Sequence, residues 1–115
     1  MKNINSTDFE QRCYFFSVNT ISFVKSMQKA GFQDEKSLTL MKFAGSIGTK
    51  ILDAYDIEDE KTVENIVVEC KKLAENCHNL FQNIRCGNDK LLLKEKAELQ
   101  IDALKLSEDF EKFLQ

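Results

Sequence analysis

The sequence predicts an all-α protein, a single antiparallel up-down-up-down four-helix bundle spanning residues 1–115. Three observations lead to this fold. The chain has no proline and only four glycines, so few residues would interrupt long helices. Apolar residues recur at alternating steps of three and four over most of its length. Stop signals divide the chain into four segments of similar length, and such helices with short connections pack as a bundle. The predicted helices span 7–29, 35–55, 59–85 and 89–114.

The first segment begins at Thr7, which forms a capping box with Glu10 three residues later. It should end before Gly31, because glycine favours the left-handed conformation that follows many helices. Tyr14, Val18 and Ile21 widen its apolar face. The main apolar stripe consists of Phe9, Cys13, Phe16, Thr20, Phe23 or Val24, and Met27.

The second segment, with Asp34 as a plausible N-cap, carries two adjacent apolar stripes. One contains Leu40, Ala44, Ile47, Ile51 and Ala54, and the other contains Met41, Gly45, Gly48, Leu52 and Tyr55. Each internal glycine costs roughly 1 kcal/mol of helix propensity relative to alanine. Gly45 and Gly48 therefore indicate a place where a neighbouring helix comes close, and this helix should be central to the bundle.

Acidic residues open the third segment, where they suit the positive end of a helix dipole. Its apolar heptad positions are Val63, Ile66 or Val67, Cys70, Leu73 or Ala74, Cys77, Leu80 or Phe81, and Ile84. Gly87 stops this helix, and Asn88 or Asp89 caps the fourth. The fourth segment has one stripe of Leu92, Leu99, Ala103, Leu106, Phe110 and Phe113, and a second of Leu93, Ala97, Ile101 and Leu104.

Composition limits the function. Apolar runs are far shorter than the ~18 residues of a membrane span, and no signal-peptide segment is evident, so we expect a cytoplasmic protein that does not enter membranes. The four cysteines show no stapling pattern and read as reduced core thiols. The net charge of −3 disfavours nucleic-acid binding, although residues 1–55 carry a net +2, so such binding remains possible there.

No pattern of residues indicates catalysis, a metal or another cofactor. His78 is the only histidine, and no Cys-x-x-Cys or Cys-x-x-His spacing accompanies it. Glu75 and His78 have the Glu-x-x-His spacing of di-iron bundles, but a second histidine is missing. Cys77 and His78 point about 100° apart on a helix, so they do not form a nucleophile–base pair. We expect a protein that is not an enzyme, with His78 at the edge of the core.

One stretch resembles a known family. Residues 40–54 contain the basic Lys42, the pair Ser46-Ile47, then Gly48, Ile51 and Asp53, and the third segment adds Val63, Ile66, Val68, Lys71 and Glu75. This pattern resembles the bacterial four-helix bundle protein family, encoded in intervening sequences of large-subunit ribosomal RNA genes and often labelled as ribosomal proteins. Phe43, Lys50 and Leu52 depart from it. The resemblance implies a non-enzymatic bundle assembled in rings of five. It extends to the accessory protein of diversity-generating retroelements, which binds a reverse transcriptase and nucleic acid.

Two candidate surfaces follow from the second segment. Lys42, Ser46, Lys50 and Asp53 form a polar stripe, which is either a solvated face or a contact surface for a subunit or a phosphate. Lys50 and Asp53 are placed to pair at i,i+3. The surplus apolar surface predicts self-association, with Phe43, Gly45, Gly48 and Tyr55 at or near the subunit contact. We therefore expect a homo-oligomeric scaffold that presents a repeated surface to an unidentified protein partner, and the resemblance implies that the oligomer is a pentamer. The alternative is a nucleic-acid-binding accessory protein of a reverse transcriptase, or one associated with ribosomal RNA.

Overall fold

The computed structural model describes residues 7–115, with side chains from Asp8 onward. Four helices make up the described chain: α1 (Thr7–Lys29), α2 (Glu35–Ala54), α3 (Glu60–Asn83) and α4 (Lys90–Leu114). The predicted helix bounds agree with these within two residues, and the predicted all-α four-helix bundle is confirmed. The capping box of Thr7 and Glu10 lies outside the described residues, because the Thr7 side chain is not among them.

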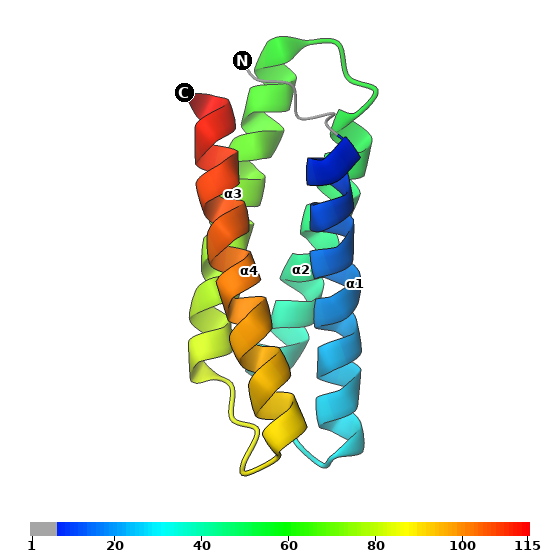
Figure 1. Ribbon diagram of the computed structural model, residues 1–115. Coiled ribbons are helices and arrows are strands. Elements are labelled where there is room, and N and C mark those ends of the chain that lie inside the picture. The colour runs from blue at the N-terminus through cyan, green and yellow to red at the C-terminus, as the bar shows by residue number, and fades with distance from the viewer. Residues whose placement is uncertain (1–6) are drawn as a thin grey trace.

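The helices run alternately up and down in a rod of 46 × 22 × 20 Å (Figure 1). The α1–α2 and α3–α4 turns lie together at one end, here called the hairpin end. The start of α1, the α2–α3 turn and the end of α4 lie at the other, the terminal end. Consecutive helices pack closely, whereas α1 and α4 make the fewest contacts of any neighbouring pair. None of the described helices is both long enough and apolar enough to cross a membrane.

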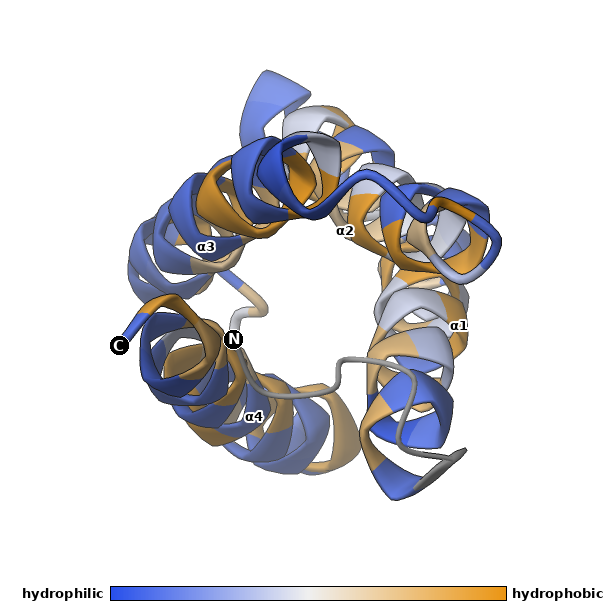
Figure 2. Cartoon of the chain, turned by 90° about the horizontal axis from the view of Figure 1, so that it is seen from above, coloured by the Kyte–Doolittle hydropathy of each residue, from blue (hydrophilic) through white to orange (hydrophobic). Residues whose placement is uncertain are grey.

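The core is built from the main apolar stripe of each helix, which faces the bundle axis (Figure 2). The structure resolves the alternatives in the heptad pattern of α3: Val67, Ala74 and Phe81 are buried, whereas the residues one position earlier are half-buried. On α1, both Phe23 and Val24 are buried. Polar residues also enter the core, since Ser17, Thr20, Ser37 and Ser107 are buried.

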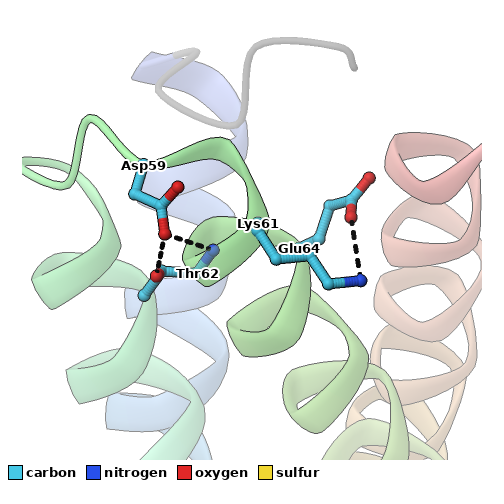
Figure 3. Close-up of polar contacts among 4 residues, drawn as sticks. All are labelled: Asp59, Lys61, Thr62 and Glu64. Carbon is cyan, nitrogen blue, oxygen red and sulfur yellow. Dashed lines mark hydrogen bonds and ion pairs between the residues drawn. The ribbon is translucent and has the colours of Figure 1, made fainter.

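Three aspartates fix the helix starts by accepting hydrogen bonds from amides that lack a helical partner. Asp34 Oδ1 accepts from the Ser37 amide at 2.8 Å, and Asp89 Oδ1 accepts from the Leu92 amide at 3.0 Å. At the start of α3, Asp59 accepts from both the hydroxyl and the amide of Thr62, the latter at 3.3 Å (Figure 3). These two bonds, led by the hydroxyl, lower the pKa of the Asp59 carboxyl.

The two turns of the hairpin end touch each other. Gly31 and Gly87 both adopt positive φ angles, of 89° and 57°, which suits glycine after a helix end. Position 87 also has no room for a side chain, because a Cβ there would lie 2.9 Å from Cζ of Phe32. The Phe32 ring of the α1–α2 turn thus packs on the backbone of the α3–α4 turn and ties the two hairpins together.

Candidate interaction surfaces

The predicted polar stripe lies on the outer surface of α2. Lys42 and Asp53 are exposed, and Ser46 and Lys50 are half-buried toward α3. Lys50 Nζ lies 2.8 Å from Glu69 Oε2 of α3, and this hydrogen bond raises the pKa of Lys50. The predicted ion pair between Lys50 and Asp53 is therefore wrong, because Lys50 pairs instead with Glu69 on the neighbouring helix. None of the four stripe residues lines the cavities described below.

The residues predicted to lie at a subunit contact, which are Phe43, Gly45, Gly48 and Tyr55, do not share one flank of α2. Gly48 faces α1 of the same chain, since a Cβ there would lie 3.0 Å from Oγ and 3.1 Å from Cβ of Ser17. Gly45 is on the same flank, with Ile21 as the nearest side chain. Phe43 is seven residues before Lys50 and therefore on the flank that faces α3, where it packs against the core. Only Tyr55, 47% exposed, remains largely open to solvent.

The close approach at Gly48 thus joins two helices of one bundle. Whether these residues also lie near a subunit contact stays a prediction, and Gly45 and Gly48 would take part only at the margin of such a contact. The side chains that remain open on this flank are those at its terminal end, beyond the glycines.

An exposed apolar surface lies there, formed by the second stripes of α1 and α2. Its members are Tyr14, Val18, Leu52 and Tyr55, with exposed fractions of 60%, 42%, 62% and 47%. We call these four residues the α1–α2 face. A shallow cavity of about 170 Å³ lies within it, lined by Tyr14, Leu52, Gly48, Ile51, Glu10 and Gln11. The second stripe of α4 is also exposed, with Ile101 at 54% and Leu104 at 44%.

The hairpin end holds a basic depression that sequence reasoning missed. A cavity of about 430 Å³ is lined by Lys36 of α2, by Lys96 of α4 and by the α3–α4 turn with Arg85. Lys96 Nζ donates to the carbonyl of Ile84 at 2.7 Å and so closes the end of α3. These cations are far apart in sequence, but basic residues near both Gly31 and Gly87 were a usable signal, because an up-down bundle places both turns at one end.

The cysteines and the histidine occupy structural positions. All four cysteines are free and buried, as predicted for core thiols. Burial raises the pKa of Cys13, Cys70 and Cys77 to about 12 and also raises the pKa of Cys86. His78 is half-buried at the edge of the core, with Nδ1 3.2 Å from the carbonyl oxygen of Gln100. Within residues 7–115, His, Cys, Asp and Glu side chains form no cluster of three that could hold a metal ion.

Comparisons with protein-family models, with curated proteins and with solved structures returned no match. The resemblance of residues 40–54 to the bacterial four-helix bundle family therefore stays an expectation from the sequence.

Proposed function

We propose that this protein is a non-enzymatic, self-associating helical scaffold that presents a repeated surface to a protein partner in the cytoplasm. The observation that carries the proposal is the α1–α2 face, where two adjacent helices leave four large apolar side chains between 42% and 62% exposed. Exposed apolar side chains gathered on neighbouring helices are typical of interaction surfaces. The family resemblance would make the assembly a ring of five.

The energetics favour association of moderate strength. Full burial of a large apolar side chain is worth about 1.5–3 kcal/mol, and these four are roughly half exposed. Closing the α1–α2 face would therefore contribute several kcal/mol per subunit, which is comparable with the entropic cost of association. We expect assembly at micromolar rather than nanomolar concentrations.

Light scattering of the purified chain at micromolar concentration tests this proposal. A mass above 13.3 kDa, the mass of one chain, is the expected result. Leu52→Glu places a charge at the centre of the α1–α2 face and should shift the mass toward the monomer. Leu91→Glu, at a side chain that is 66% exposed on α4, is the matched control and should leave the mass unchanged. A clean monomer in the unmodified protein would contradict self-association.

Nucleic-acid binding, in the manner of a reverse-transcriptase accessory or ribosomal-RNA-associated protein, is the second candidate. The basic depression at the hairpin end is the observation that favours it, because Lys36 and Arg85 are exposed cations that bind no acidic side chain within residues 7–115. The salt dependence of RNA binding separates this candidate from the scaffold, because phosphate contacts weaken steeply with added salt.

A further inference from the structure

A groove runs between α1 and α4, the first and last helices of the bundle. These helices stand side by side at the front of Figure 1, yet they contact each other least among neighbouring pairs. Two cavities, of about 140 and 340 Å³, lie between them. Both are lined only by residues of α1 and α4, and both include Asn19 and Asp102. We call these two adjoining cavities the α1–α4 groove.

Side chains of α1 and α4 face each other across the groove at intervals of about seven residues, a series of positions that we call the ladder. An ion pair occupies one of these positions. Arg12 of α1 lies 2.6 Å from Asp109 of α4. Seven residues further along α1 is Asn19, and seven residues earlier on α4 is Asp102, so the next position pairs an amide with a carboxylate. Another step along α4 reaches Glu95, which lines the same cavity as Ser22 of α1. The α4 side of the ladder stays acidic, whereas the α1 side becomes neutral.

Among the described residues, no cation of α1 forms an ion pair with the acids Glu95, Glu98 and Asp102 of this wall. Asp102 and Glu95 form no ion pair within residues 7–115, and Glu98 has only Lys94 of its own helix at 4.0 Å. Between the two walls, the floor is apolar, formed by buried Phe16, Leu99 and Leu106. The ring of Phe15 is 55% exposed on the rim. An apolar floor beside a row of unneutralised acids fits a partner with apolar side chains on one face and cations next to them.

We propose that the α1–α4 groove binds a basic amphipathic helix of a partner protein. Its apolar side chains would contact Phe15 and the floor, and its Lys or Arg residues would pair with Asp102, Glu95 and Glu98, as Arg12 pairs with Asp109. The ladder from Asp109 to Glu95 spans 14 residues, or roughly 21 Å at ~1.5 Å per residue. The occupant is therefore a helix of about four turns.

This inference names the partner class of the interaction function proposed above and rests on it. The groove and the α1–α2 face nevertheless lie on opposite flanks of α1. Charge complementarity selects the basic helix over a second copy of this chain docked through the same groove. The groove lining contains three acids, Glu95, Glu98 and Asp102, and a single cation, Arg12, which already pairs with Asp109.

Fluorescence anisotropy with a labelled 18-residue amphipathic helix built from leucine and lysine tests the inference. A peptide of the same pattern with glutamate in place of lysine is the comparison probe. We expect micromolar binding of the lysine peptide and at least tenfold weaker binding of the glutamate peptide. The double variant Asp102→Asn with Glu95→Gln should weaken lysine-peptide binding at least tenfold. Asn19→Arg should weaken it similarly, because the new guanidinium would pair with Asp102 from within the chain.

The matched control is Asp56→Asn with Glu58→Gln, which removes the same charge from the α2–α3 turn and should bind the lysine peptide like the unmodified protein. Equal loss in the control and the groove variant would show non-specific attraction and overturn the inference, as would no binding at all. Dissociation of a homo-oligomer by the groove variant would assign the groove to a second copy and also overturn it. Monomeric Leu52→Glu should still bind the peptide, so failure of self-association and failure of groove binding give different results.

Discussion

Thr20 shows how a single buried hydroxyl affects the core. Its side chain is completely buried on α1, and Oγ1 finds no hydrogen-bond partner among the described residues. A buried, unsatisfied polar atom costs about 1–3 kcal/mol of stability, and valine has nearly the same shape without the hydroxyl. We expect Thr20→Val to raise the free energy of unfolding by about 1 kcal/mol in urea titration. Thr20→Ala, which leaves a void instead, should lower it, and equal values for both variants would contradict this account.

Gly48 and Gly45 share a flank of α2 but differ in the space around them. A Cβ at Gly48 meets Ser17 at 3.0–3.1 Å, whereas a Cβ at Gly45 has its nearest neighbour at 3.9 Å. Gly48→Leu should therefore destabilise the bundle by about 1–3 kcal/mol through overpacking. Gly45→Ala should stabilise it by up to about 1 kcal/mol through helix propensity. Thermal unfolding measures both, and a stabilising Gly48→Leu would show that α1 and α2 are not packed as described.

At the scale of the element, the start of α3 depends on the charge of Asp59. The hydrogen bonds from Thr62 lower the pKa of this carboxyl in the folded protein, so the folded state favours the charged form. The resulting stability is present above the unfolded pKa of about 3.9 and is lost as the pH falls through the lower folded value. Asp59→Asn should therefore be less stable than the unmodified protein at pH 7, and the difference should disappear in strong acid.

Urea unfolding at pH 7, 5 and 3 measures this difference. Asp56→Asn in the same turn is the control, because Asp56 caps no helix in the described chain and should show little change at any of these pH values. A gap between the Asp59→Asn variant and the unmodified protein that stayed constant from pH 7 to 3 would mean that charge does not contribute to the cap.

The main stripe of each helix was predictable because periodicity alone decides which face turns inward. The second stripes were not, because their burial depends on which neighbour covers them. On α2, Gly45 and Gly48 are covered by Ile21 and Ser17 of α1, whereas Leu52, one turn further, is 62% exposed. Burial of Ser17 follows from the absence of a side chain at Gly48, and such a pairing becomes visible only when the register between helices is known.

At the scale of the whole molecule, the fold brings together charged residues that are far apart in the sequence. Lys50 pairs with Glu69 rather than Asp53, and Arg12 with Asp109, because helix register brings distant residues together. The acidic wall of the α1–α4 groove arises in the same way. Glu95, Asp102 and Asp109 recur at heptad spacing in the sequence. Only the antiparallel alignment of α1 shows that Asp109 meets Arg12, whereas Asp102 and Glu95 lie beside the neutral Asn19 and Ser22. The sequence therefore contained the groove residues but not the reason that they lack partners.

The rod also has ends of opposite charge. The hairpin end, residues 22–40 and 79–97, carries seven Lys or Arg and four Asp or Glu. The terminal end, residues 7–15, 49–67 and 105–115, carries five Lys or Arg and eleven Asp or Glu. The rod is 46 Å long, and the Debye length is ~8 Å at physiological salt, so a nucleic acid at one end is screened from the other. The excess of three cations at the hairpin end limits how many phosphates it neutralises.

A gel shift with a 30-nucleotide single-stranded RNA tests the consequence. We expect weak binding at 20 mM salt that is lost by 150 mM, with log affinity falling against log salt with a slope of about −2, since about three phosphates are neutralised. Lys36→Glu with Arg85→Glu should abolish even the low-salt shift. Lys61→Glu with Lys112→Glu changes the net charge equally at the terminal end and should leave the shift intact. A shift that persists at 150 mM salt and requires Lys36 and Arg85 would favour nucleic-acid binding over the scaffold function. Three excess cations on one subunit are too few for such binding, so the cations of neighbouring subunits would have to act together with them.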